Sequence, residues 1–342
     1  MNDDTLAPRR PRWLLILLVI LILVAAAWSG FWYFAARTVE KNVTAWMEQE
    51  ARFGRVYACA SRTVGGYPLR IEMRCTDPVV EIKTAPLVVK AKEFIALAQV
   101  FEPNVITGEI VGPFSLAPPD KPPLFTGTWQ LARASVRFTP MPDHVSVVVD
   151  GAKFDSSAPG SQGVASADHI ELHGDLDTVS NKPVFTFSAT VTGATAPDAG
   201  TFGARPTDVN ITAVLRGLND FAPKPLPVRL KEWQAAGGRL EITNIRVKQG
   251  DAVAVAKGDL GLSVNGRVDG TIGLTLAGFD QVIQTVLGSQ GKNTGLFAVA
   301  GLSLLGKPVD LEGKKAIAVP LRFTDGAVYF GPIPLGKTPP LY

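Results

Sequence analysis

The sequence predicts a mainly β protein, with an extended, curved antiparallel sheet behind an N-terminal transmembrane helix. Residues 13–36 form an uncharged apolar run, and from Val56 onward apolar and polar residues alternate along most of the chain. Gly, Asn and Asp turns separate the alternating segments at regular intervals, which favours hairpins over crossover helices. The pattern leaves open whether the sheet forms a groove, a sandwich or an open barrel.

Residues 13–36 are long enough to cross a bilayer as one helix, and they are expected to act as a signal anchor. Arg9, Arg10 and Arg12 precede the apolar run, so the positive-inside rule keeps residues 1–12 in the cytoplasm and exports the rest. We therefore expect a single-pass protein of the inner membrane with its body in the periplasm.

A cleaved signal peptide is the alternative. The small residues Ala25, Ala26 and Ala27 could form a cleavage site. However, the apolar run continues past them through Trp28 and Trp32, as membrane-spanning helices with interfacial aromatic residues do. The sequence favours an anchor that is retained.

The rest of the chain divides into a helix that continues from the membrane, residues 37–55, and a β-rich body, residues 56–342, with one or two lobes. Two short late helices are expected at 280–289 and 294–306, each with an apolar side that should pack on the sheet. Pro-rich runs at 113–123 and 222–227 are candidate linkers.

Composition indicates a folded body and argues against nucleic-acid binding. Hydrophobic residues make up 46% of the chain and charged residues 19%, which is too apolar for a disordered protein. The formal net charge is only +3, and no dense cluster of Lys and Arg is interleaved with aromatic residues. We expect the inner membrane, with lipid or an envelope protein, to be the partner.

The two cysteines, Cys59 and Cys75, flank a Gly65-Gly66 turn between two alternating segments. Two antiparallel strands would bring them side by side, and an oxidising periplasm would close the disulfide. A buried pair of free thiols is the alternative. The spacing is not that of a C-x-x-C redox motif, and there is no second cysteine pair for a zinc site.

Residues 331–338 match the phosphate-binding P-loop pattern, but their context argues against nucleotide binding. Pro332 and Pro334 remove two of the backbone N–H groups that would hold phosphates. Four residues after Thr338 the sequence ends, so no helix can follow the loop as the motif requires. The pattern is interpreted as a turn, and no nucleotide or other cofactor is expected.

One cluster of polar residues could hold a metal ion. On a strand, His169, Glu171 and His173 would project from the same face. Two imidazoles and a carboxylate can bind zinc, but the same alternation describes any strand with one solvated face. The solvated face is the favoured interpretation, and no catalytic, cofactor or metal residue is assigned.

Three motifs point to a family: "CASRTVGGYPLRIEMRC", "FEPNVITGEIVGP" and "VPLRFTDGAVYFGPIPLG". Behind an N-terminal anchor they resemble the domain-of-unknown-function family numbered 2125, single-pass proteins of alphaproteobacteria. That resemblance implies no activity, cofactor or catalytic residue. More distantly, the anchor and the closing segment are similar to AsmA-type envelope proteins, whose β grooves are associated with lipid homeostasis.

Three functions remain open at this stage. The favoured one is a non-catalytic envelope protein that handles lipid on an apolar β groove. The second is a structural or scaffolding protein whose apolar face is fully covered. The third is an exported hydrolase, which would need a cleft with converging titratable groups that the sequence does not display.

Overall fold

The computed structural model describes residues 12–84, 86–157, 163–179, 182–218, 220, 224–278 and 306–342. Its helices are α1 (Arg12–Arg52), η1 (Pro197–Ala199), α2 (Gly200–Gly203) and α3 (Leu226–Ala235). The strands are β1 (Arg55–Ala58), β2 (Ser61–Gly65), β3 (Arg70–Thr76), β4 (Val79–Ile82), β5 (Leu87–Lys90), β6 (Glu93–Gln99), β7 (Val105–Val111), β8 (Phe114–Ala117), β9 (Phe125–Thr128), β10 (Leu131–Phe138), β11 (Pro142–Ser156), β12 (Ala165–Val179), β13 (Lys182–Ala194), β14 (Thr207–Arg216), β15 (Arg239–Gln249), β16 (Ala252–Leu262), β17 (Val268–Ala277), β18 (Lys307–Leu311), β19 (Lys314–Thr324), β20 (Ala327–Phe330) and β21 (Ile333–Lys337).

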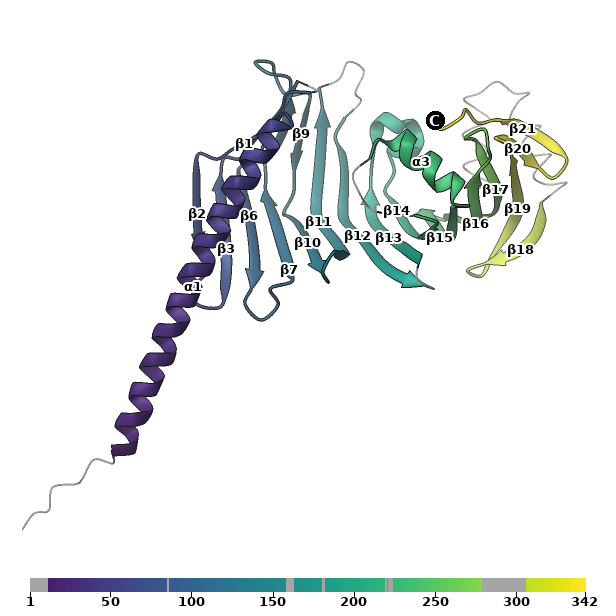
Figure 1. Cartoon of the computed structure of the whole chain (residues 1–342). Coiled ribbons are helices and arrows are strands. Elements are labelled where there is room, and N and C mark those ends of the chain that lie inside the picture. Colours follow the sequence, from purple (N-terminus) through teal and green to yellow (C-terminus); the bar gives the residue numbers. More distant parts are fainter. Residues whose placement is uncertain are drawn as a thin grey trace, which may run out of the picture.

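The 21 strands in these described residues belong to a single sheet. All of their pairings are antiparallel, and the main run is β2, β3, β6, β7, β10, β11 and then β12 to β17 in order. Beyond β17 comes β19, whose far edge carries β18 and β20, and β21 pairs with β20. Figure 1 shows this sheet as a long, twisted and curved surface, which confirms the expected fold class.

The sheet divides at β11, which is long enough to pair with two strands along one edge. Its first part pairs with β10, whereas residues 153–156 pair with β9. From β9 a second wing continues through β8, β5 and β4 to β1. The N-terminal third of the body therefore has two wings joined at β11.

Alternation along each strand gives the main run one apolar face, because pairing in register places residues of like parity on the same side. We call this surface the apolar face. From β6 to β15 it carries Phe94, Ala96, Ile106, Ile110, Ala134, Val136, Val145, Val147, Val149, Ile170, Leu172, Phe187, Ala189, Val191, Val209, Ile211, Ala213, Ile245 and Val247. The opposite face is mainly polar, with Arg, His, Ser, Thr, Asp, Glu and Asn side chains, although Ile95 and Val148 also lie on it.

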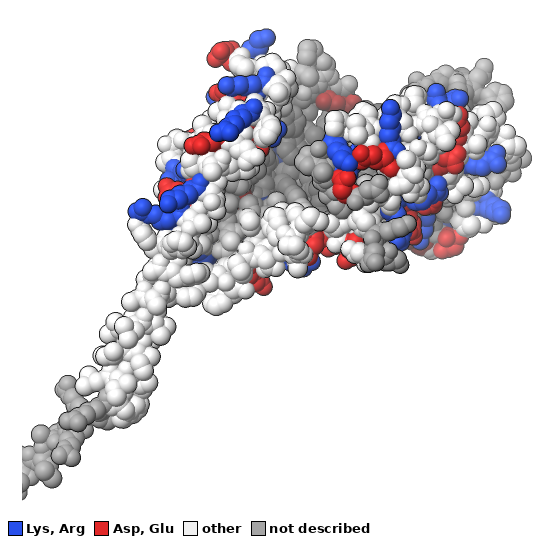
Figure 2. All heavy atoms as spheres, viewed as in Figure 1, with Lys and Arg blue, Asp and Glu red and all other residues white. Residues whose placement is uncertain are grey.

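Helix α1 combines two roles in one uninterrupted element. Among the described residues, α1 is the one helix that is long and apolar enough to cross a membrane, and its apolar run lies in its N-terminal half. The start of that half, before the contacts that Trp28 and Trp32 make with the β2–β3 hairpin, stands clear of the body and shows no charged side chain in Figure 2. Its C-terminal half contacts β1 and β2, where the rings of Trp46 and Tyr57 lie 4.8 Å apart. The helix ends at Arg52, close to the expected boundary at residue 55.

Helix α3 was not expected, since the sequence suggested a linker at 222–227. The structure starts the helix at Leu226, with Pro227 in its first turn and Gly237, at φ +66°, just after its C-cap. Proline at a helix start and glycine past its end are signals that the sequence does contain. The expected helix at 280–289 lies outside the described residues, as does the one at 294–306 except for its last residue.

The cysteine-flanked hairpin forms as the sequence suggests. Strands β2 and β3 are antiparallel, and Cys59 and Cys75 form a disulfide with Cα atoms 5.4 Å apart. A disulfide that closes a loop of this size stabilises the fold by roughly 3 kcal/mol. At the turn, Gly66 has φ +97°, and a Cβ atom there would lie 2.8 Å from the carbonyl oxygen of Arg70.

Gly66→Val should therefore destabilise the protein by about 1–3 kcal/mol, because a β-branched residue is strained at positive φ. Gly65→Val is the matched control, since a Cβ atom at Gly65 meets nothing within 4 Å and β-branched residues suit a strand. Thermal unfolding of both variants in detergent measures the difference. Equal losses of stability would contradict the assignment of the special position to Gly66.

Candidate functional site

Among the described residues, the apolar face is only partly covered in the middle of the sheet (Figure 1). On β12 to β14 its buried side chains are the short ones of Ala189 and Ala213. Its larger side chains there are only half-buried: Ile170, Leu172, Phe187, Val191, Val209 and Ile211. In Figure 1, α1 lies over the β2–β3–β6 end and α3 near β14 to β16, and no described helix lies over β11 and β12. The surface in Figure 2 is hollowed between these two parts.

Such a surface is unusual on a folded domain, since large contiguous apolar patches are rarely left exposed without a partner. Strands lie about 4.8 Å apart, so the five strands from β10 to β14 give a surface roughly 20 Å across. The chemistry it offers is burial of apolar groups without hydrogen bonding. It suits an acyl chain or the apolar side of another protein segment.

The apolar face reaches three neighbouring hairpin tips, the first of which contacts α1. These tips are Gly66–Leu69 between β2 and β3, Val100–Asn104 between β6 and β7, and Thr139–Met141 between β10 and β11. The backbone N–H of Val100 donates to Leu69 O at 3.0 Å, and that of Phe138 donates to Asn104 O at 2.9 Å, so the tips form a row. On the apolar face next to this row, Ile106 and Val145 are 46% and 38% exposed.

At the opposite end of these strands, α1 covers an apolar cavity of about 260 Å³. The helix contributes Val43, Trp46 and Met47, and the two wings of the sheet and the disulfide contribute most of the other walls. Arg62 is the charged residue in the lining, and its guanidinium donates to Thr44 Oγ1 at 2.6 Å. The cavity therefore extends the apolar surface beneath α1.

The three histidines lie on the polar face, where His144 and His169 pair with carboxylates across strands and His173 pairs with a carboxylate on its own strand. His169 Nδ1 lies 2.6 Å from Asp150 Oδ1, and His144 Nδ1 lies 2.6 Å from Asp175 Oδ1. Glu171 sits between His173 Nε2, at 2.9 Å, and His169 Nε2, at 3.6 Å. As expected, His169, Glu171 and His173 lie together on the solvated face.

These contacts shift the pKa values of two side chains, His169 and Glu171. The hydrogen bond with the Asp150 carboxylate raises the pKa of His169 above its ordinary value, and Glu171 adds to the effect. Hydrogen bonds with His173 and His169 lower the pKa of Glu171. Within the described residues, no group of three or more His, Cys, Asp or Glu side chains is arranged to hold a metal ion.

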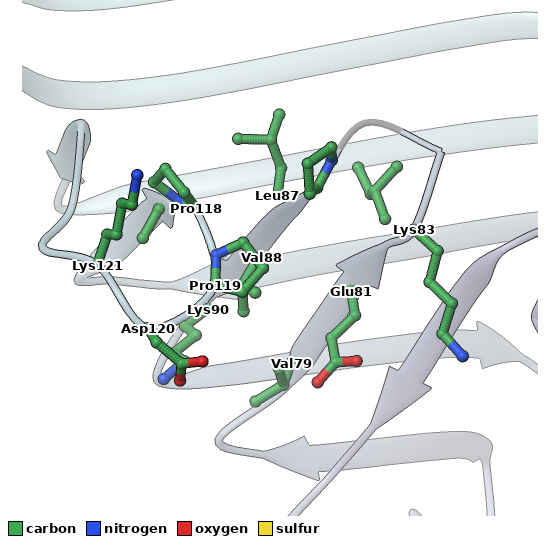
Figure 3. A pocket seen from close by; sticks show the side chains of 13 residues that line it. Val79, Glu81, Lys83, Leu87, Val88, Lys90, Pro118, Pro119, Asp120 and Lys121 are labelled. Atoms are coloured by element: carbon green, nitrogen blue, oxygen red, sulfur yellow. The ribbon is translucent and has the colours of Figure 1, made fainter.

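A pocket of about 660 Å³ lies on the second wing, between β4, β5, β8 and the loop after β8. Figure 3 shows its charged side chains, with Lys83 and Lys121 at opposite ends and the carboxylates of Glu81 and Asp120 between them. These charges have both signs and do not converge on one point. The pocket therefore offers no focus for a specific ligand.

The P-loop pattern falls on a β-hairpin. Gly331, at φ +57°, and Pro332 connect β20 to β21, and Lys337 is the last residue of β21. The segment thus contains the turn that the sequence analysis expected, followed by a strand that it did not. Its backbone is not the loop and helix start that cradles phosphates.

Comparison with known proteins gives one match. Residues 32–339 match the family model described as "Uncharacterized protein conserved in bacteria (DUF2125)". No curated protein and no solved structure matches the chain. The match covers the end of the apolar half of α1 and every described strand of the sheet, so the apolar face belongs to the part that defines the family.

The His169–Asp150 pair gives a pH-dependent prediction. Because the pKa of His169 is raised, the pair stabilises the fold below the ordinary histidine value of about 6.5, and this contribution disappears as the pH rises through the raised pKa. Asp150→Asn should return the titration of His169 toward the ordinary value. NMR titration of histidine-labelled protein measures it, with His169→Gln used for assignment.

Asp175→Asn is the matched control, because Asp175 makes the equivalent cross-strand contact with His144. It should leave the titration of His169 unchanged. A titration of His169 that is the same in the wild type and in Asp150→Asn would show that the pair does not form in solution.

Proposed function

Since the chain belongs to the DUF2125 family of bacterial proteins, whose description names no activity, we propose a function from its structure: an inner-membrane-anchored periplasmic protein that binds lipid acyl chains on its apolar face. The observation that carries the proposal is the row of large, half-buried side chains on β12 to β14. The role is non-catalytic, and the anchor is α1 with its N-terminus in the cytoplasm.

The orientation is supported by the charge before the helix and by the disulfide in the body. Arg9, Arg10 and Arg12 precede the apolar half of α1, and such residues remain on the cytoplasmic side. The body then lies in an oxidising compartment, where a disulfide such as Cys59–Cys75 is stable. Both features agree with a periplasmic location.

Lipid is favoured as the ligand because the apolar face and the anchor are continuous. The face begins beneath α1, at the cavity lined by Trp46 and Met47, and its exposed end at Ile106 and Val145 adjoins the row of tips whose first member contacts the helix. Exposure of an acyl chain to water costs about 0.8 kcal/mol per methylene, and contact with an apolar face avoids the part of this cost that corresponds to the covered area. The apolar face therefore lowers the free energy that a chain needs to leave the bilayer.

Native mass spectrometry of the full-length protein in detergent tests the proposal, and it should reveal a co-purifying lipid. Val147→Asp places a charge on the apolar face, whereas Ser146→Asp places one on the polar face of the same strand. The first substitution should remove the bound lipid and the second should leave it, because burying an unpaired carboxylate beside an acyl chain is costly.

Circular dichroism of both variants shows whether the sheet is retained. A wild-type protein that has its sheet but carries no bound lipid would contradict the proposal. A co-purifying protein in place of lipid would favour the scaffolding alternative instead.

A further inference from the structure

The tip between β2 and β3 is hydrogen-bonded to the apolar half of α1. The indole N–H of Trp28 donates to Pro68 O at 3.1 Å, and that of Trp32 donates to Arg70 O at 3.0 Å. The hydroxyls of Ser29 and Tyr67 lie 2.9 Å apart. These three contacts fix the tip at the level of residues 28–32 of the helix.

That level corresponds to the outer boundary of the hydrocarbon core if α1 is the anchor proposed above, on which this inference rests. A bilayer core is about 30 Å thick, which about 20 helical residues span at 1.5 Å per residue. Counted from Trp13, the first uncharged residue of the run, the span ends near Trp32. The aromatic residues Trp28, Trp32 and Tyr33 then form the belt that marks a membrane interface.

The side chains on the tip and on its neighbour suit that environment. Tyr67 and Leu69 are each 54% exposed, and Phe101, on the adjacent β6–β7 tip, is 74% exposed. In water these groups would form an exposed apolar cluster, whereas at the membrane boundary they would be buried in lipid. The backbone carbonyls of Pro68 and Arg70 accept from indole N–H groups, so they need no water there.

Basic side chains lie at the level expected for headgroups. The guanidinium of Arg37 lies 4.9 Å from the centre of the Tyr33 ring, one turn beyond the aromatic belt. The side chain of Arg70, at the start of β3, pairs with the Glu72 carboxylate at 3.0 Å and is still 54% exposed. Both can meet lipid phosphates while the apolar side chains beside them enter the acyl region.

We infer that the β2–β3 and β6–β7 tips insert into the periplasmic leaflet of the bilayer that holds α1, through Tyr67, Leu69 and Phe101. The body is then held to the membrane at two places besides the helix itself. This second attachment fixes its orientation, and it places the exposed end of the apolar face, at Ile106, directly above lipid.

Fluorescence quenching of full-length protein in liposomes tests this inference. The native cysteines are paired, so Phe101→Cys provides a single thiol for an environment-sensitive NBD label. The liposomes contain phosphatidylethanolamine and phosphatidylglycerol, with or without lipids that carry a doxyl spin label on the acyl chain. A label at residue 101 should emit at shorter wavelength than in water and should lose most of its emission to the doxyl lipids.

Two control positions separate the possible outcomes. A label at Leu23→Cys, within the anchor, should be quenched, and one at Val264→Cys, 84% exposed in the β16–β17 loop, should not. If the label at residue 23 is quenched but the labels at residue 101 and at Leu69→Cys are not, the inference is overturned and the proposed anchor is retained. If residue 23 is not quenched, the proposed anchor is itself wrong. Blue-shifted emission at 101 without quenching would indicate a protein partner and would also overturn the inference.

Discussion

The structure depends on one constraint, the alternation of side chains along antiparallel strands held in register. Ala134 faces Val147, Val147 faces Leu172, and Leu172 faces Ala189, so each added strand extends the same apolar surface. Hydrogen bonding between strands satisfies the backbone of the sheet but does nothing to cover this surface. A sheet that continues for so many strands outgrows the helices that the described residues place on it. An open apolar face follows from the same pattern that makes the fold.

Helix α1 gives that open face a direction. Because one helix runs without a break from residue 12 to residue 52, the segment that would cross the membrane and the segment that packs on the sheet form a single rod. Trp46 lines the apolar cavity at one end of the face, and Trp28 and Trp32, nearer the N-terminus of the helix, donate hydrogen bonds to the β2–β3 tip. The body therefore has a defined position and orientation relative to the apolar half of α1, and in the proposed function a ligand from the membrane enters the face from the end beside α1.

Local patterns predicted the elements but not their partners. Alternation and the Gly65-Gly66 turn predicted β2, β3 and the pairing of their flanking cysteines, because a hairpin joins neighbours in the sequence. The pairing of β3 with β6, and the division of the sheet at β11, depend on contacts between distant segments that carry no local signal. For the same reason His169 was visible as part of a solvated face, whereas its partner Asp150, on another strand, was not. Helix α3 could have been predicted from Pro227, had the proline run not been interpreted as a linker.

Site-specific photo-cross-linking in intact cells tests the central claim, that the apolar face receives lipid, most directly. A benzoyl-phenylalanine in place of Leu172 would lie in the middle of the apolar face, and one in place of Thr190 would lie on the polar face of the neighbouring strand. After irradiation, the protein labelled at 172 should carry a covalently attached lipid that mass spectrometry detects, and the protein labelled at 190 should carry none. Cross-links at 172 only to protein, or equal lipid labelling at both positions, would contradict the claim.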